Sequence, residues 1–505
     1  MKKLKKALSL LIATLTAFSI VGCSGGDIPG VDSGEKPSGK VDLYVGVYDG
    51  GLSYEWAERL AKEFETIHNV EVEIRHKKNE YDDAMLLTQI ANNDEDIYYG
   101  NANILSSFVA SGLVEDLTDI VTEKIFDDKG DPVKTGATLS IEDTMWEDWR
   151  QYVKSDNKYY AIPNFTSVAG IAYDADLFEE KGYEVPKTYD ELLALMNKMA
   201  NQDSVTPFTF SSMTYIIDTV LREFHANYEG RNNFYLNSTF KGTDSVLGAI
   251  NEENAYQLQR QEGKKAAFQF AYDLAHNANY TTSLTKSGGD YLQSQKEFVN
   301  SVGASGKTNR IAMFLENSWW EREVKSTIES MGEINPEWGW GQRNFKYMVA
   351  PVNNKLTNRD TISCGYTDSM VFINKNSKRK ELAKEWLKFC QSSESLSVYV
   401  AETCTLRPYT FTMKENIYNE CTSYTKSIID LMLRDDVDFV PFGSACDTAK
   451  KIPDFNYDWC DKSSVKGQSP SAPYSFFKAF TDVTVDQYFA GCYTYYSNKW
   501  SGYIQ

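Results

Sequence analysis

The chain has 505 residues, with 71 Asp and Glu against 52 Lys and Arg, and a formal net charge of −19. At about 100–200 residues per domain, this length predicts at least two folded units, and a hydrophobic content of 42% is enough for packed cores. The acidic balance argues against nucleic-acid binding, which needs clustered Lys and Arg. Aromatic residues make up 13% of the chain, an excess that cores or flat apolar ligands would use.

The first 22 residues predict a secretory signal. Lysines near the start precede an uncharged, mostly apolar stretch that ends at Gly22-Cys23. This ending resembles the lipobox of bacterial lipoproteins, where the cysteine becomes the lipidated first residue of the mature chain. We therefore expect residues 1–22 to be a signal peptide and Cys23 to be lipidated. Residues 23–40, rich in Gly, Ser and Pro, should form a flexible tether.

From residue 41 the pattern predicts strands that alternate with helices. A β-branched and aromatic strand over 41–48 ends at an Asp-Gly-Gly turn, and apolar residues then recur at helical spacing over 56–67. Strands over 70–74 and 96–100 and helices over 82–92 and 104–111 follow. Such β-α-β units are typical of an α/β sheet.

The pattern becomes more mixed after residue 158. Pro163 marks a change of chain direction, and Thr188 with Glu191 three residues later predicts a capped helix start. The remaining predicted elements are strands over 310–314, 347–351 and 370–373 and an amphipathic helix over 378–395. Residues 225–300 and 440–505 show no clear pattern, although the second range is rich in Tyr, Phe and Trp.

The cysteines and histidines do not predict a metal site. Seven cysteines follow Cys23, all in the C-terminal third, without a CxxC spacing and far from any pair among the four histidines. Because seven is odd, at least one thiol stays free, and the pairing of the others cannot be derived from the sequence.

Six segments follow one another along the chain as Ser111–Leu117, Tyr159–Asn164, Ala172–Phe178, Val185–Leu192, Ala312–Trp319 and Ser377–Ser395. In this order they resemble segments of the family-1 extracellular solute-binding proteins of ABC transporters. The family's usual Tyr-Asn is Tyr173-Asp174 here, and the glycine of its Gly-Ser-Trp is Asn317. The chain is also longer than typical members, with the excess around 225–300 and after 440.

The resemblance implies an α/β fold of the periplasmic-binding-protein type, class II, in which hinge strands join two α/β lobes around a ligand cleft. It divides the chain into an N-terminal lobe of residues 41–162 and 349–405 and a C-terminal lobe of residues 163–348 and 406–505. We expect the crossovers near Pro163, near Ala350-Pro351 and near Thr405 to Pro408.

Such a protein needs no catalytic residue, metal or cofactor, but its cleft must fit the solute. A sugar stacks its C–H face on an aromatic ring and hydrogen-bonds its hydroxyls to Asp, Glu, Asn or Arg. Residues of these types lie in loops next to predicted strands or after the long helix. The candidates are Tyr48, Asp49, Tyr99, Asn101, Asn164, Phe165, Glu316, Trp319, Trp320, Trp340, Tyr366, Asp368 and Arg407.

For each aromatic candidate, packing in a core is the common alternative. Trp319 and Tyr366 are favoured as ligand contacts because their segments resemble ligand-facing ones of the family. Asp49 is equally explained as a turn former before two glycines, and Arg407 could cap a helix.

These features favour a monomeric lipoprotein, anchored through Cys23 to the outer face of a bacterial cell membrane, of Gram-positive type. It would capture an oligosaccharide and deliver it to the membrane permease of an ABC importer. A peptide or polyamine ligand is the alternative within the binding class. A surface glycoside hydrolase is a third, since two carboxylates could flank a glycosidic bond, but with 71 acidic residues their number is no evidence.

Overall fold

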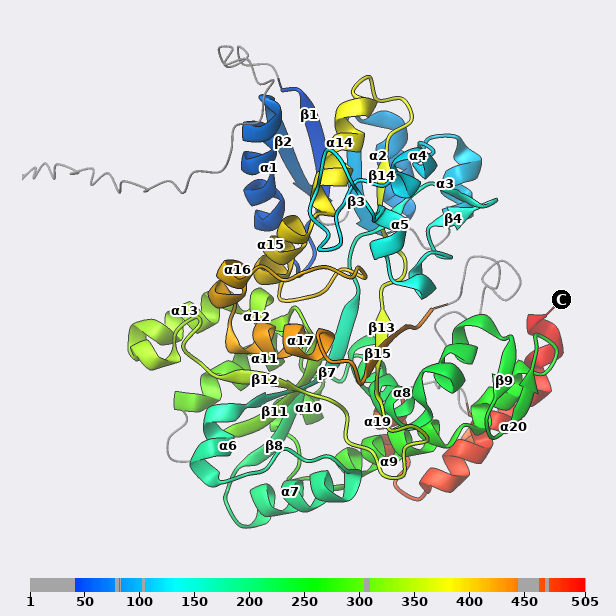
Figure 1. Ribbon diagram of the computed structural model, residues 1–505. Coiled ribbons are helices and arrows are strands. Elements are labelled where there is room, and N and C mark those ends of the chain that lie inside the picture. The colour runs from blue at the N-terminus through cyan, green and yellow to red at the C-terminus, as the bar shows by residue number, and fades with distance from the viewer. Residues whose placement is uncertain are drawn as a thin grey trace, which may run out of the picture.

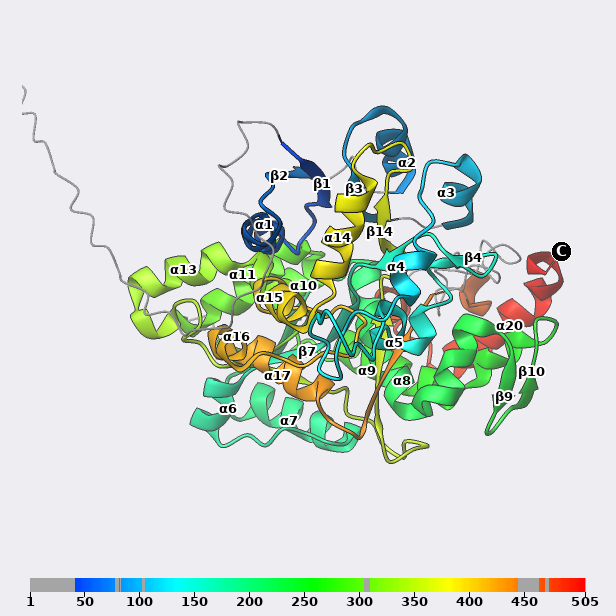
Figure 2. The ribbon, with the colours of Figure 1, turned by 45° about the horizontal axis from the view of Figure 1, so that its top comes forward.

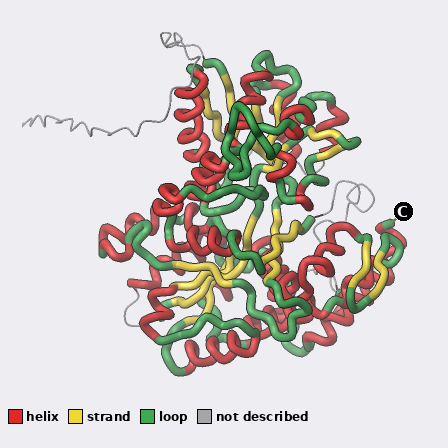
Figure 3. Tube along the Cα trace, in the orientation of Figure 1, coloured by secondary structure: helices red, strands yellow, loops and turns green. Residues whose placement is uncertain are grey.

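The computed structural model describes residues 41–77, 81, 83–101, 105–303, 309–443, 463–467 and 472–504. The predicted signal peptide, Cys23 and the tether lie outside these residues. The described chain forms two lobes, each built on a β-sheet with helices around it (Figures 1 and 3). This arrangement confirms the expected α/β class with two sheet-containing lobes.

The first lobe, at the top of Figure 1, contains a sheet with the strand order β2-β1-β3-β14-β6. β1 is parallel to both β2 and β3, whereas β14 is antiparallel to β3 and to β6. The bounds are β1 (Leu43–Tyr48), β2 (Val72–Lys77), β3 (Ile97–Asn101), β6 (Ile162–Pro163) and β14 (Ser369–Ile373).

The second lobe contains a sheet with the order β15-β13-β7-β11-β8, and β12 pairs with β7. β7 is buried along its whole length and is antiparallel to β11, β12 and β13. The bounds are β7 (Ser167–Asp174), β8 (Thr206–Phe210), β11 (Ile311–Asn317), β12 (Phe345–Met348), β13 (Asp360–Gly365) and β15 (Val437–Pro441). The described residues also form two short hairpins, β4 (Lys154–Ser155) with β5 (Lys158–Tyr159) and β9 (Gly242–Asp244) with β10 (Gly248–Ile250).

Helices cover both sheets. Those of the first lobe are α1 (Glu55–His68), α2 (Asp83–Asn92), α3 (Leu105–Ser111), α4 (Thr118–Thr122), α5 (Ile141–Thr144), α14 (Lys380–Cys390) and α15 (Ser393–Thr403). The others are α6 (Ala175–Lys181), α7 (Tyr189–Asn201), α8 (Thr214–Thr239), α9 (Glu262–His276), α10 (Ser283–Ser287), α11 (Tyr291–Asn300), α12 (Trp320–Glu323), α13 (Lys325–Ile334), α16 (Glu415–Glu420), α17 (Ser423–Met432), α19 (Pro473–Ala479) and α20 (Val485–Tyr503). Of the short 3₁₀ turns, η1 (Glu147–Trp149) and η2 (Ala255–Arg260) matter below.

Local sequence signals explain where several helices begin. The predicted capping box is confirmed at α7, where Thr188 and Glu191 each bond the backbone of the other. The single helix predicted over 378–395 is instead two helices. Ser392 ends the first run because its hydroxyl accepts a hydrogen bond from the Ser395 amide and so caps a new helix, α15.

The chain crosses between the lobes at the expected Pro163, since β6 belongs to the first sheet and β7 to the second. The crossover expected near Ala350-Pro351 lies instead at residues 365–369. β12 and β13 both pair with β7 in the second sheet, and only β14 returns to the first. A third crossing follows α15, where Leu406 bridges Thr166.

The two regions without a clear sequence pattern pack against each other. Phe240 and Tyr256 from the first contact Trp500 of α20, whose indole Nε1 donates to the Glu252 carbonyl at 2.7 Å. With Leu236 and Ile250, these residues form a small separate core. Figures 1 and 2 show the strand β9 and the helix α20 next to each other beside the C-terminus. The excess length of the chain therefore builds an appendage of the second lobe, from parts far apart in the sequence.

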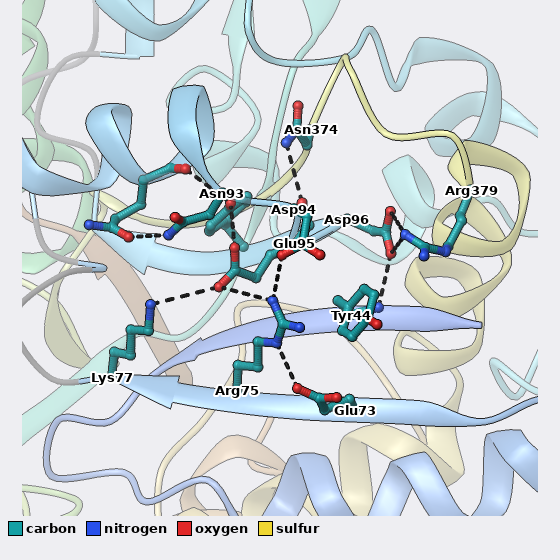
Figure 4. Close-up of polar contacts among 12 residues, drawn as sticks. Tyr44, Glu73, Arg75, Lys77, Asn93, Asp94, Glu95, Asp96, Asn374 and Arg379 are labelled. Atoms are coloured by element: carbon teal, nitrogen blue, oxygen red, sulfur yellow. Dashed lines mark hydrogen bonds and ion pairs between the residues drawn. The ribbon is translucent and has the colours of Figure 1, made fainter. Parts of the chain in front are cut away.

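The acidic run before β3 fixes the first sheet. Glu95 and Asp96 are each only 1% exposed. The Tyr44 amide donates to Asp96 at 2.9 Å, and Arg379 lies 3.4 Å from the same carboxylate, while Arg75 approaches Glu95 to 3.8 Å (Figure 4). Buried carboxylates are stable when they are paired and hydrogen-bonded in this way. We assign this cluster to the fold rather than to a ligand.

Within the described part of the chain, no helix is both long and apolar enough to cross a membrane. The described cysteines Cys364, Cys390, Cys404 and Cys421 are buried free thiols, and Cys492 is buried as well. The remaining two after Cys23, at 446 and 460, lie outside the described residues.

Candidate functional site

Three aromatic side chains meet where the lobes join. The Phe165 ring lies 5.8 Å from the Trp319 ring and 5.3 Å from the Tyr366 ring, and the last two lie 5.2 Å apart. Phe165 is in the first crossover, Tyr366 is in the second, and Trp319 follows β11. Phe165 is buried, whereas Trp319 and Tyr366 are half-buried. We call these three residues the junction cluster.

The crossover segments beneath this cluster are hydrogen-bonded to one another. The Thr166 hydroxyl donates to the Gly365 carbonyl at 3.0 Å, and the Thr405 hydroxyl donates to the Thr166 carbonyl at 3.1 Å. Thr405 also lies 2.5 Å from the Ser318 hydroxyl, next to Trp319. The junction cluster therefore lies next to the three connections between the lobes. A relative motion of the lobes would change the positions of its rings.

A loop of the first lobe contacts the second lobe beside the cluster. Gly51 has a φ of +59°, and a Cβ at this position would lie 2.7 Å from Glu323 Oε1 and 3.0 Å from the Trp319 ring. Only glycine permits this approach at this backbone conformation. Arg322 reinforces the contact, because its Nη2 lies 3.1 Å from Glu55 and 3.3 Å from the Ser53 hydroxyl.

Buried polar oxygens lie near the contact between the two lobes. Glu316 accepts from the Asn317 backbone amide at 2.9 Å with one oxygen, while its Oε2, Asn317 Oδ1 and Asn164 Oδ1 have no hydrogen-bond partner among the described residues. Burial, with a smaller contribution from the negative charge of Glu323, raises the pKa of Glu316 to about 8. Unpartnered buried acceptors are costly, and a ligand with many donors would satisfy them.

Four further candidates lie at strand ends around the junction. Tyr48 ends β1 and lies over Gly50, and Asn101 ends β3. Asp368 lies in the turn between β13 and β14. Asp49 Oδ2 lies 3.3 Å from His76 Nδ1 on β2, so it contacts its own sheet.

Residues 59–416 match the family described as bacterial extracellular solute-binding protein. The chain belongs to this family. The match spans most of both lobes and all three crossovers, so the junction described above lies within the family's common region.

Solved structures of sugar-binding proteins share the fold. This solute-binding protein superposes on a chitin oligosaccharide binding protein with 15% identity and a TM-score of 0.55, over 91% of this chain and 99% of that chain. For the maltotriose binding protein of Thermus thermophilus bound with maltotriose, the identity is 15% and the TM-score 0.53, over 90% and 98%. For maltose-bound MalE3 of T. maritima, they are 15% and 0.56, over 91% and 100%. The fold of this solute-binding protein is therefore that of maltose-binding proteins.

The structure places four of the sequence candidates away from the junction. Tyr99 is fully buried in the first lobe, where its hydroxyl accepts from Trp386 at 3.0 Å. Arg407 is also fully buried, with its guanidinium 3.9 Å from the Tyr399 ring. Trp320 packs in the core of the second lobe. Trp340 lies beside α13, under the Lys325 ammonium. Because Tyr99, Arg407 and Trp320 pack inside the cores of the lobes and not at the junction, we do not count them among the junction candidates.

Sequence reasoning missed the residues that join the lobes beside the cluster, namely Gly51, Ser53, Glu55, Arg322 and Glu323. Gly51 carried a signal, since a Gly-Gly pair after a strand marks a close turn. The charged residues carried none, because acidic and basic side chains are frequent along the whole chain.

Proposed function

We propose that this solute-binding protein captures a carbohydrate, an oligosaccharide in particular, between its lobes and delivers it to the permease of an ABC importer. The junction cluster carries the proposal. Its rings offer apolar faces of the kind on which sugars stack. They lie on two crossovers and on the second lobe, next to the Gly51 loop of the first lobe. A ligand held there would contact both lobes only in the closed state and would therefore stabilise closure.

Three observations support a saccharide rather than another solute. Half-buried Trp319 and Tyr366 lie edge to face, 5.2 Å apart. The unpartnered oxygens of Asn317 and Asn164 could accept from sugar hydroxyls, and the Glu316 carboxyl could donate to them or accept from them. The solved structures that share the fold include proteins bound to maltose and to maltotriose.

The same acceptors would also suit a polyamine, whose ammonium groups donate only. A binding panel separates the two ligands. Intrinsic tryptophan fluorescence of the full chain is titrated with maltotriose, a chitin oligosaccharide, raffinose and spermidine. Saturable binding of a saccharide below millimolar concentration is expected. Saturation by spermidine, with no response to any saccharide, would replace the carbohydrate by a polyamine.

We further propose that Cys23 carries the lipid anchor that holds the protein on the outer face of the membrane, and that the protein acts as a monomer. The Gly22-Cys23 ending after an apolar stretch supports the anchor. Cys23→Ser should shift the protein from the membrane fraction to the culture medium. A variant that stays in the membrane fraction would contradict the anchor.

Delivery to a permease is tested separately, in whole cells. Uptake of the bound saccharide should be lost when the gene is deleted and restored by the wild-type chain. Release of product sugars from excess substrate by the purified chain would instead indicate hydrolysis.

A further inference from the structure

A groove on the second lobe, separate from the junction cluster, carries positive charge on an acidic protein. Its volume is about 880 Å³, and it runs between β12, α17 and the segment before α7. Figure 1 shows α17 beside β12 on the lower lobe. Its charged lining consists of Lys187, Lys346, Lys355, Lys426 and Arg434 with Asp360 and Asp430. The chain as a whole has a formal net charge of −19.

Two of these cations are ion-paired inside the groove. Asp360 lies 2.8 Å from the Lys355 ammonium and 2.7 Å from the Arg434 guanidinium, so one carboxylate serves both. Lys187, Lys346 and Lys426 differ, because no carboxylate of the described chain lies within ion-pair distance of them. They come from three separate elements, and together they present unbalanced positive charge to one volume.

Neutral groups suited to a saccharide lie among these lysines. The Lys426 ammonium lies 5.5 Å from the centre of the Tyr418 ring, whose hydroxyl donates to Asp430 at 2.8 Å and so fixes the ring. Asn344 and Ser423 add an amide and a hydroxyl to the lining. Aromatic, amide and hydroxyl groups next to cations can bind both the sugar ring and its acidic substituents.

The same geometry disfavours a peptide. A peptide strand would bind by adding to the free edge of β12 and would need its outward backbone groups. The Tyr347 amide on that edge already donates to the Ser427 hydroxyl at 2.8 Å, so α17 occupies this donor. The volume of the groove is also in the range of small-ligand sites, roughly 300–1,000 Å³.

We propose that this groove binds an anionic saccharide, whose carboxylate, sulfate or phosphate groups pair with Lys187, Lys346 and Lys426. The site lies outside the lobe junction and does not depend on the function proposed above. It would let the protein hold an acidic glycan while the junction holds its solute.

Titration calorimetry of the full chain tests this site with three anionic probes, trigalacturonate, sucrose octasulfate and glucose 1,6-bisphosphate. They separate carboxylate, sulfate and phosphate as the recognised group. Lys346→Gln with Lys426→Gln should weaken the best probe by about tenfold for each lysine, or about 1.4 kcal/mol, because each substitution removes a charge-assisted hydrogen bond. Lys62→Gln with Lys296→Gln, exposed lysines elsewhere, removes the same charge and should leave binding unchanged.

Added salt should weaken the interaction, and hydrogen exchange of residues 344–351 should slow when the probe binds. The proposal is overturned if no anionic saccharide binds, or if both double variants lose affinity equally. It is also overturned if hexaglutamate binds more tightly than every saccharide, which would identify a surface for acidic protein segments. Circular dichroism and melting temperature confirm that each variant is folded.

Discussion

Arg322 and Glu55 form an ion pair across the two lobes, with 3.1 Å between Nη2 and Oε1. Arg322 lies on α12 of the second lobe and is 7% exposed, whereas Glu55 begins α1 of the first lobe and is 49% exposed. The pair lies beside the contact of Gly51 with Trp319 and Glu323. It therefore links the position of α1 to the junction cluster.

Glu55→Gln should weaken closure slightly. A partly exposed ion pair is worth about 0.2–1 kcal/mol, so affinity for the junction ligand should fall by a few-fold without a change in melting temperature. Glu180→Gln is the matched control, because Glu180 pairs with Arg310 at 3.0 Å within the second lobe. Binding isotherms for both variants decide, and equal affinities would contradict a role of the pair in closure.

Trp319→Ala should reduce saccharide affinity at least tenfold and leave the melting temperature almost unchanged, because Trp319 is half-buried at the lobe junction. The comparison is Trp386→Ala, which removes a fully buried ring from the first lobe and should cost about 3–5 kcal/mol of stability. Fluorescence titration and thermal unfolding measure the two effects. A large loss of stability in the Trp319 variant would show that the ring serves the core.

Stability should fall as pH rises from about 4.5 towards 8. Burial raises the pKa of Glu316 to about 8, so the folded protein holds a proton that the unfolded chain releases above its ordinary pKa near 4.5. The contribution is complete below the unfolded pKa and is lost as pH rises through the folded one. Glu321 and Glu229, both with pKa values raised to about 7, act in the same direction.

Melting temperatures between pH 5 and 9 test this for the wild type and for Glu316→Gln. The variant cannot ionise at this position, so its melting temperature should decline less over the same range. Parallel curves for the two proteins would show that Glu316 is ionised in the folded state.

Trp500→Ala should destabilise the appendage as one unit. The helix α8 is interrupted at Gly230, where the backbone is not helical. The indole joins α20 to the segment after this kink, through contacts with Phe240 and Tyr256. Hydrogen exchange should therefore accelerate together in residues 236–258 and 485–503, while the two main sheets keep their protection. Tyr495→Ala, a half-buried ring of the same helix, serves as control. Faster exchange in α20 alone would contradict a shared core.

The sequence by itself determined much of the local structure. Strand and helix periodicity located the first β-α-β unit, because side chains of one face must be buried in each element. The Thr188 and Glu191 capping box and the crossover at Pro163 were also predictable, since they depend on neighbouring residues. The six segments that resemble solute-binding proteins, found in the same order along the chain, predicted the two-lobed α/β fold.

Only the tertiary structure decided which side chains face the junction. Trp319 and Trp320 are adjacent, yet the first joins the cluster and the second lies in a core, because α12 starts between them and turns one ring inward. The second crossover lies at residues 365–369 and not near 350 as predicted. β13 stays in the second sheet because it pairs with β7, which is far away in the sequence. Likewise, the apolar side chains of Phe240 and Ile250 are buried against Trp500 of α20. Such burial depends on partners far along the chain, which local periodicity does not record.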